Sequence, residues 1–346
     1  MSTRPTRRRI LTGSLAASAL AANALAASAA ARDRADPRFD AVRAYARSQH
    51  TTGFLVISDG RTLVEDNWPA PQGDPRFRLF VYGATPEGAL LEDVASQQKS
   101  FVSVLAAAAV DRGLLEVARP VSDYLGAGWS KASPAQEAQI SVLHVLTMSS
   151  GLTTGFAHAA PPGSVFLYNT PVYAITKQVL AAAAKRSLEA ITQDWLTGPA
   201  QMRQTSWRQR PAVFAAVGNP TGLVTSPRDI ARLGMIVLGG GVAQGGARIV
   251  SEASLAAMFV RSPANPAYGR LWWLNGGAFC IRPPARRTEG PLIPAAPPDL
   301  VAALGLLDRK LYVVPSRRLI VVRTGAGAPD KDFDQQLWAR LMPALA

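Results

Sequence analysis

Ser96 and Lys99 are the residues of this sequence whose types and spacing point most directly to chemistry. They lie three residues apart at the start of a run whose pattern predicts a helix from Ser96 to Leu115, broken at Gly113. Residues at this spacing face the same side of a helix, one turn apart. A lysine that burial keeps neutral can accept the serine proton, and the helix N-terminus offers N–H groups and partial positive charge to a developing oxyanion. The pair therefore predicts a serine nucleophile that needs no histidine.

The same pair also has a purely structural interpretation, in which Ser96 caps the helix and Lys99 lies in solvent. Other catalytic centres have little support. His50, His144 and His158 are present, but the pentapeptide G-x-S-x-G is absent. The sequence also has no H-E-x-x-H motif, no Cys/His spacing typical of zinc, no phosphate-binding loop and no dinucleotide fingerprint. We therefore expect no metal and no cofactor.

The composition is that of a globular protein, with 48% hydrophobic and 18% charged residues among 346. The single cysteine, Cys280, excludes an internal disulfide and is expected to be a buried small hydrophobe. The formal net charge is +13. The arginines are scattered and no aromatic residues are interleaved with them, so we expect a solvated basic surface and no nucleic-acid partner.

Residues 1–31 have the pattern of an export signal. The arginines Arg7, Arg8 and Arg9 precede an uncharged Ala/Leu-rich stretch, and small residues fit cleavage after Ala26 or Ala29. An arginine pair before the apolar run indicates the twin-arginine route of bacteria. The alternative is an uncleaved anchor, because about 20 apolar residues can span a bilayer. We predict a cleaved signal, a periplasmic or secreted protein, and no stable membrane insertion after cleavage. Removing the four arginines at positions 4, 7, 8 and 9 leaves a charge of 13 − 4 = +9.

The hydrophobic patterns place strands near both ends of the chain and helices in the middle. The expected strands are a hairpin over 54–65 and the segments 300–307, 310–314 and 319–324. The expected helices are 36–50, 140–148, 171–184, 188–196, 227–238, 251–259 and 330–345. Residues 68–95 are expected to be irregular, and residues 274–299, with six prolines, to form a long loop that rims or lines a site.

These patterns predict an α/β (α+β) fold in which both chain termini complete one antiparallel sheet flanked by helices. A single catalytic domain over 36–346 would then comprise an α/β part, residues 36–95 and 262–346, and an inserted all-helical subdomain, residues 96–261. The oligomeric state is left open.

Several segments in the same order resemble the serine β-lactamase-like family of class C β-lactamases, DD-peptidases, esterases and nylon-oligomer hydrolases. The similarity extends over roughly residues 38–346. The segments are S-Q-Q-K-S-F at 96–101, V-L-T-M-S-S-G-L at 145–152, F-L-Y-N-T at 166–170, T-S-P-R-D-I-A-R-L-G at 225–234, Y-G and W-W at 268–273, and L-G at 304–305. The resemblance implies a β-lactamase/transpeptidase-like fold.

By this resemblance, Ser96 is the nucleophile, Lys99 its general base and Tyr168 a second acid/base. We expect the Lys99 ammonium to lower the pKa of Tyr168. The backbone N–H groups of Ser96 and Leu306 would form the oxyanion hole. The residues expected to contact substrate are Asn169, Thr170 and Gly305.

Two departures from the family's motifs bear on the substrate. The family usually has Asn two residues after the tyrosine, whereas here Asn169 is adjacent and Thr170 takes the second position. The family's H/K-T-G strand reads Ala303-Leu304-Gly305, without the side chains that help to hold a substrate carboxylate. This favours hydrolysis of a carboxylic ester or a small uncharged amide.

The alternatives are a β-lactamase or D-amino-acid-peptide hydrolase, and a non-catalytic binding protein whose third motif has decayed. An arginine such as Arg282, Arg286 or Arg287 reaching the cleft would restore a site for an anionic substrate.

Overall fold

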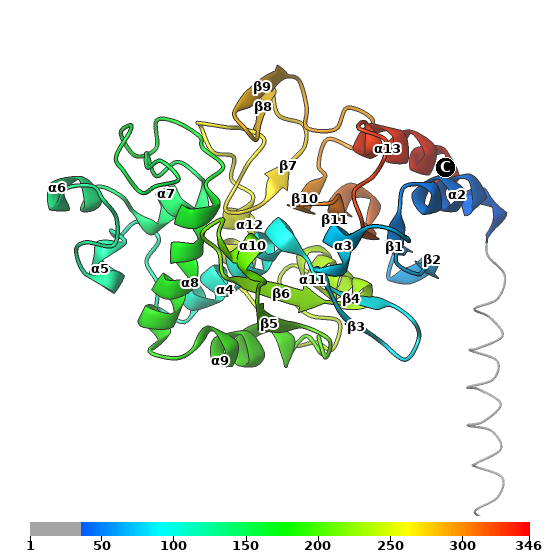
Figure 1. Ribbon diagram of the computed structural model, residues 1–346, viewed down its shortest axis with the longest axis horizontal. Coiled ribbons are helices and arrows are strands. Elements are labelled where there is room, and N and C mark those ends of the chain that lie inside the picture. The colour runs from blue at the N-terminus through cyan, green and yellow to red at the C-terminus, as the bar shows by residue number, and fades with distance from the viewer. Residues whose placement is uncertain (1–35) are drawn as a thin grey trace, which may run out of the picture.

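The computed structural model of the protein describes residues 36–346 (Figure 1). The predicted export signal, residues 1–31, lies outside the described residues. Within the described part, no helix is both long enough and apolar enough to cross a membrane.

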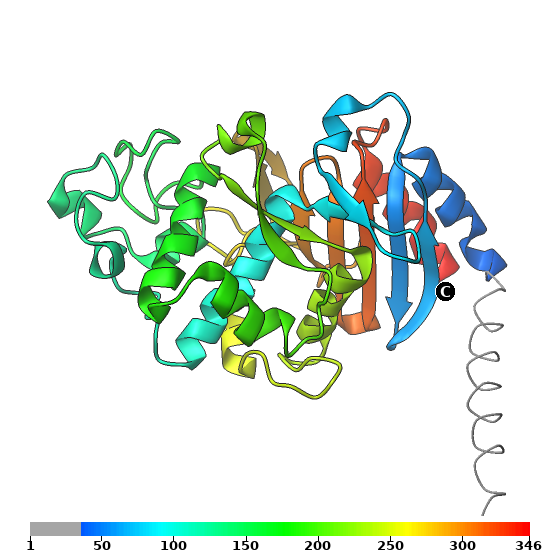
Figure 2. The ribbon, with the colours of Figure 1, turned by 60° about the horizontal axis from the view of Figure 1, so that its bottom comes forward.

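A six-stranded antiparallel sheet joins the two ends of the chain, in the order β2-β1-β12-β11-β10-β7. Its strands are β1 (Thr51–Ser58), β2 (Arg61–Asn67), β7 (Trp273–Leu274), β10 (Val301–Gly305), β11 (Arg309–Val314) and β12 (Leu319–Gly325). The early strand β1 lies beside the late strand β12 (Figure 2). In this pairing Val56 lies opposite Val321. The prediction that both termini complete one sheet is confirmed.

Helices cover both faces of this sheet, which explains why β12 is buried along its whole length. The early helix α2 (Asp40–Ser48), preceded by a 3₁₀ turn (Pro37–Phe39), packs with the closing helix α13 (Phe333–Ala344) on one face. Helix α11 (Pro227–Leu238) covers the other. The absence of a side chain at Gly234 lets α11 approach closely, because a Cβ there would lie 3.0 Å from the Ile320 side chain.

A second sheet takes strands from two segments in which the sequence predicts none. One is 68–95, which is predicted to be irregular, and the other is 96–261, which is predicted to be all-helical. Both predictions are wrong in this respect. The strands of this sheet, in the order β3-β4-β6-β5, are β3 (Val81–Ala84), β4 (Leu90–Asp93), β5 (Ser206–Gln209) and β6 (Thr221–Thr225). Helix α3 (Pro75–Arg78) precedes it. Each strand is short and irregular in pattern, and β4 ends in two acids. Pairing with distant strands stabilises such a segment, and a local pattern cannot reveal that.

The predicted loop 274–299 also contains strands, a hairpin of β8 (Phe279–Arg282) and β9 (Arg286–Glu289). The predicted helices of the middle segment are present, with ends shifted by a few residues. The remaining helical elements are α4 (Gln98–Asp111), α5 (Ser122–Leu125), α6 (Pro134–Glu137), α7 (Val142–Leu146), α8 (Thr170–Ala184), α9 (Leu188–Thr192), a π turn (Gln193–Thr197), α10 (Ala212–Ala215), α12 (Glu252–Met258) and 3₁₀ turns at Ala95–Gln97 and Pro315–Arg317.

Helix α4 is the central element of the helical part. Every residue from Gln98 to Ala109 is buried, and α8 and α12 pack against it. Four successive alanines, 106–109, let these neighbours approach closely. A polar residue at the start of α4 is therefore surrounded by protein.

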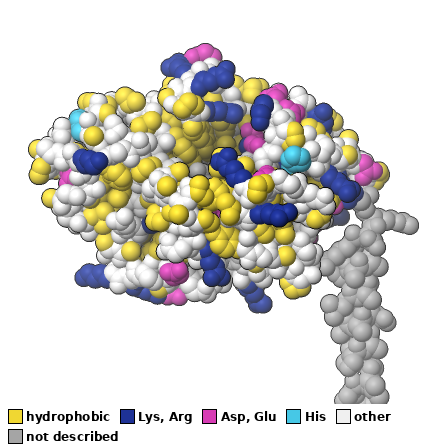
Figure 3. Space-filling view, in the orientation of Figure 1, with side chains coloured by type: hydrophobic (Ala, Val, Ile, Leu, Met, Phe, Trp, Pro, Cys, Tyr) yellow, Lys and Arg dark blue, Asp and Glu magenta, His cyan; other side chains and the backbone are white. Residues whose placement is uncertain are grey.

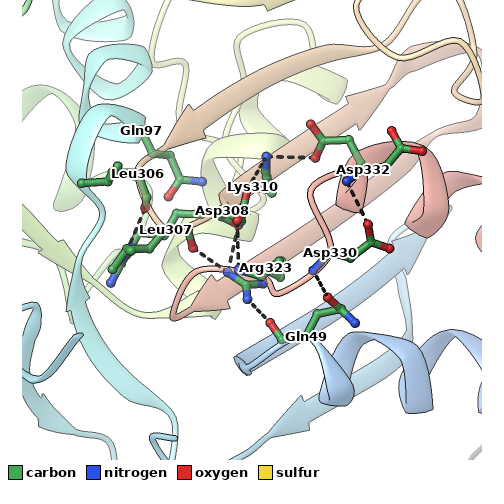
Figure 4. A network of polar contacts seen from close by, with 12 residues as sticks. Gln49, Gln97, Leu306, Leu307, Asp308, Lys310, Arg323, Asp330 and Asp332 are labelled. Carbon is green, nitrogen blue, oxygen red and sulfur yellow. Dashed lines mark hydrogen bonds and ion pairs between the residues drawn. The ribbon is translucent and has the colours of Figure 1, made fainter. Parts of the chain in front are cut away.

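Arg323 of β12 fixes the turn that follows β10. Its side chain is fully buried and donates to the backbone carbonyls of Leu307 at 2.7 Å and Asp308 at 3.1 Å (Figure 4). It also donates to the Ala326 carbonyl at 2.7 Å and to the Thr51 hydroxyl at 3.1 Å. One guanidinium thus satisfies acceptors from several separate segments, as its rigid fork of five donors allows.

Replacing Arg323 with Met is expected to destabilise the fold by about 3 kcal/mol or more, because several buried carbonyls lose their donor. Arg318→Met is the matched control, since Arg318 forms an exposed ion pair with Asp59. Such a pair contributes about 0–1 kcal/mol. Urea unfolding of both variants measures the difference, and equal midpoints would contradict this role of Arg323.

Candidate active site

Ser96 and Lys99 lie together at the entry to α4. Ser96 belongs to the 3₁₀ turn Ala95–Gln97, and the Lys99 side chain, one turn further on, places Nζ 3.0 Å from Ser96 Oγ. Lys99 is only 2% exposed, so the interpretation in which it lies in solvent is wrong.

The surroundings of Lys99 favour a neutral amine. Burial holds the pKa of Lys99 well below its usual range, and the positive charges of Arg210 and Lys177 act in the same direction. Its second hydrogen-bond partner is another hydroxyl, Thr170 Oγ1 at 3.3 Å. An amine in this state can accept the proton of Ser96.

Tyr168 closes the other side of the pair, with its ring centroid 4.8 Å from Lys99 Nζ. Burial raises the pKa of Tyr168 to about 12, and a hydrogen bond with Ser96 opposes this only in part. The expected lowering of this pKa is therefore wrong, because a buried Lys99 that prefers its neutral form supplies no ammonium at rest. Tyr168 keeps its proton at neutral pH and can donate it in a hydrogen bond.

The turn after β10 brings Leu306 to the same site. Gly305 allows this approach, because a Cβ there would lie 2.4 Å from the carbonyl oxygen of Val94, just ahead of Ser96. Leu307 and Asp308 have φ values of +60° and +56°, a conformation that side chains disfavour.

Arginine contacts stabilise this turn. Arg309 donates to the Leu306 carbonyl at 3.0 Å and pairs with Glu92 at 2.8 Å, and neither member of the pair is exposed. Arg323 contacts the next two carbonyls (Figure 4). Ser96 and Leu306 line one cavity of about 560 Å³, as their expected oxyanion role requires.

The structure separates the two residues after Tyr168. Thr170 lines the cavity and contacts Lys99. Asn169 does not line the cavity: its side chain accepts from the Val172 N–H at 3.2 Å, capping α8, and donates to the Leu152 carbonyl at 2.9 Å. The expectation that Asn169 contacts substrate is not supported by this placement, because a buried helix cap has no free group for a ligand.

The expected arginines do not reach the cavity either. Arg282 donates to the Leu292 carbonyl, and Arg286 and Arg287 lie on the exposed strand β9. None of them lines the cavity, and nor does any part of 274–299. The segment, expected to rim or line a site, therefore does not line this cavity: part of it folds back as the β8–β9 hairpin, and Arg282, Leu292, Ile293 and Pro294 line a different cavity.

Arg210 lines the cavity and was not foreseen. It forms a buried, bidentate ion pair with Asp93, at 2.7 Å and 2.9 Å. Asp93 also accepts from the Ala95 N–H at 2.8 Å, directly before Ser96. The partners are 117 residues apart, and the only signal in the sequence is the pair of acids just ahead of the S-x-x-K motif.

Lys177 of α8 is a second buried lysine near the site. It donates to the hydroxyl of Thr221 at 2.7 Å and to the Thr221 carbonyl at 3.1 Å, and it contacts Asn219. Burial, together with the charge of Arg210, lowers the pKa of Lys177 to about 7. Among residues 36–346, no cluster of His, Cys, Asp and Glu side chains could hold a metal ion.

A sequence profile of the Beta-lactamase family matches residues 39–341. The chain belongs to this family. The resemblance drawn from the motifs is thereby confirmed. No curated protein matches the chain in a sequence search.

Solved structures share the β-lactamase-like fold. A β-lactamase/D-alanine carboxypeptidase from Yersinia pestis, complexed with citrate, superposes with a TM-score of 0.63 at 16% identity, over 89% of this chain and 98% of that one. A candidate 6-aminohexanoate-dimer hydrolase from Bacillus anthracis superposes with a TM-score of 0.64 at 14% identity, over 87% of this chain and 80% of that one. A class C β-lactamase in complex with cefoxitin superposes with a TM-score of 0.63 at 17% identity, over 88% of this chain and 98% of that one. The predicted fold class is therefore confirmed for this member of the Beta-lactamase family.

The pKa of Lys177 makes the stability of the fold depend on pH. Because this pKa is about 7 in the folded chain, against 10.5 when exposed, the unfolded chain binds more protons between pH 7 and 10. The free energy of unfolding should therefore rise with pH across this range, and less steeply in Lys177→Met. Urea unfolding at pH 7, 8, 9 and 10 measures both slopes. Lys185→Met is the control, because Lys185 is exposed at the end of the same helix. Equal slopes in Lys177→Met and the unmodified protein would contradict the buried, neutral state.

Proposed function

We propose that this protein is an exported serine hydrolase that cleaves carboxylic esters or small amides through an acyl-enzyme on Ser96. The observation that carries the proposal is the buried Lys99 amine 3.0 Å from Ser96 Oγ, at the edge of a cavity. Membership of the Beta-lactamase family supports a hydrolase.

In acylation, Ser96 Oγ attacks the carbonyl carbon of the substrate and its proton passes to Lys99 Nζ. The oxyanion accepts hydrogen bonds from the backbone N–H groups of Ser96 and Leu306. Lys99, now an ammonium beside Tyr168, favours loss of the phenolic proton to the leaving group, and the tyrosine regains a proton from the ammonium. The ester or amide bond breaks as this proton is transferred. Water then attacks the acyl carbon and gives its proton to the neutral lysine. The bond between the acyl carbon and Ser96 Oγ breaks as the ammonium returns this proton to Oγ, which releases the carboxylic acid and restores the neutral Lys99.

The strand beside Ser96 favours an ester or uncharged amide over a β-lactam. Ala303 is fully buried in β10, and no hydroxyl or cation stands at this strand for a substrate carboxylate. A β-lactamase or D-amino-acid-peptide hydrolase is the second candidate, which the names of the structural neighbours favour. A non-catalytic binding protein is the third, and it requires Ser96 to be unreactive.

Replacing Ser96 with Ala is expected to lower kcat for p-nitrophenyl acetate by about 10³-fold or more, because the nucleophile is lost. Lys99→Met should have a similar effect through loss of the base. Lys131→Met, at an exposed lysine, is the matched control. Fluorophosphonate labelling followed by peptide mass spectrometry should find the adduct on Ser96, and none in Lys99→Met. Absence of an adduct on the unmodified, folded protein would favour the binding protein.

Export through the twin-arginine route is part of the proposal, supported by the arginine pair and the uncharged stretch that follows it. Expressed at full length in a bacterium, the protein should be recovered from the periplasm or medium with its N-terminus near residue 27 or 30. Lysine in place of Arg7, Arg8 and Arg9 should leave the chain uncleaved in the cytoplasm. N-terminal sequencing of each fraction measures this, and an intact N-terminus on exported protein would indicate an anchor instead.

A further inference from the structure

The cavity beside Ser96 is apolar over most of its wall. Its hydrophobic lining comes mainly from α3 and the segment after it, from α10 and its flank, and from the turn after β10. These side chains are Leu79, Phe80, Val213, Phe214, Val217 and Leu306. The rings of Phe80 and Phe214 lie with centroids 4.4 Å apart and so join the two main walls.

Exposed hydrophobic side chains concentrate at the mouth of this cavity. Among residues 36–346, eight large hydrophobic residues are exposed, and four of these line the cavity: Leu79, Val213, Val217 and Leu306. Figure 3 shows hydrophobic side chains around the hollow in the middle of this face, with basic side chains nearby. An exposed apolar cluster beside a reactive group is typical of a surface that a ligand covers.

The position of Tyr168 indicates which part of the substrate occupies this cavity, the leaving group or the acyl group. Tyr168 is the residue that gives its proton to the leaving group, and it lies against Trp273 at 5.7 Å between ring centroids. Neither of these residues lines the cavity, whereas Ser96 and Leu306 do. The leaving group therefore lies toward Tyr168, and the cavity is left for the acyl group.

Two arginines also line the cavity, and they differ in what they can offer. Arg210 is buried and paired with Asp93 through two hydrogen bonds, so its charge is already matched. Arg76 of α3 is exposed and has no ion pair among the described residues. Its neighbour on the same short helix, Arg78, is exposed as well but does not line the cavity.

We propose that the acyl group of the substrate is an apolar chain of several carbons that ends in a carboxylate, with the chain in the cavity and the carboxylate on Arg76. This inference rests on the proposed ester or amide hydrolysis and names its substrate class. The acyl chain of the substrate covers the exposed hydrophobic side chains that line the cavity. Its carboxylate stays at the rim, where it keeps water contact and pairs with Arg76, which has no ion pair among residues 36–346.

Chain length is tested with p-nitrophenyl acetate and p-nitrophenyl hexanoate. Each methylene that enters the cavity should raise kcat/KM by about fourfold. Val213→Ser should reduce the hexanoate-to-acetate ratio by about threefold to tenfold. Val260→Ser should leave it unchanged, since both valines are 63% exposed but only Val213 lines the cavity. A ratio near one in the unmodified protein, or equal ratios in both variants, would overturn the apolar chain.

The carboxylate is tested with mono-p-nitrophenyl adipate, which has the same chain length as the hexanoate and a terminal carboxylate. The unmodified protein should prefer the adipate by about fivefold, and more at low salt. Arg76→Gln should abolish this preference, and Arg78→Gln, at an exposed arginine that does not line the cavity, should retain it. If both variants lost the preference for adipate equally, the effect would be one of general surface charge, and the assignment to Arg76 would be overturned. The absence of any preference in the unmodified protein would overturn it as well.

The acetate reaction separates failure of this inference from failure of the proposed function. Hydrolysis of p-nitrophenyl acetate that depends on Ser96, without any preference among acyl groups, would reject the inference and retain the hydrolase. No hydrolysis of any ester, with Ser96 unlabelled, would reject the hydrolase itself.

Discussion

Burial of the Lys99 amine without a carboxylate partner is the constraint on which the site depends. Removing an ammonium from water is strongly unfavourable unless a carboxylate pairs with it, and otherwise the group becomes neutral. Here the partners are two hydroxyls, Ser96 and Thr170, and the nearest cations add to the effect. The fold therefore favours a neutral amine by withholding a counterion, and this amine lies 3.0 Å from Ser96 Oγ, where the proposed mechanism needs a proton acceptor.

Strand β4 carries two buried acids just ahead of Ser96, and both pair with arginines rather than with Lys99. Glu92 and Asp93 are consecutive, so their side chains point to opposite faces of the strand. Glu92 pairs with Arg309, which donates to the carbonyl of Leu306. Asp93 pairs with Arg210 and accepts from the N–H just before Ser96. Both acids are thus occupied by arginines, and each also positions one side of the expected oxyanion hole.

The sequence predicts an element or a contact correctly where residues close together in the chain determine it. The strands of the large sheet and helices such as α11 follow from their hydrophobic patterns, and the motif at 96–99 predicts the contact between Ser96 and Lys99. Strand β4 is missed because its stability comes from pairing with β3 and β6 and from two distant arginines. Arg210 is missed for the same reason. The placement of Asn169 is missed because a motif gives the residue type at a position, whereas its hydrogen bonds to α8 and Leu152 depend on the packed structure.

The departure at Ala303 takes on a different meaning beside the cavity. A hydroxyl or cation on β10 would hold a carboxylate close to the reacting carbonyl, on the strand that also presents Leu306. This chain has the buried Ala303 there, and the cavity-lining arginine without an ion pair among residues 36–346, Arg76, comes from α3 instead. In the proposed substrate, the anionic group therefore lies at the end of an apolar chain that covers Leu79 and Val213. The same change that disfavours a compact lactam therefore favours a longer, flexible acyl group.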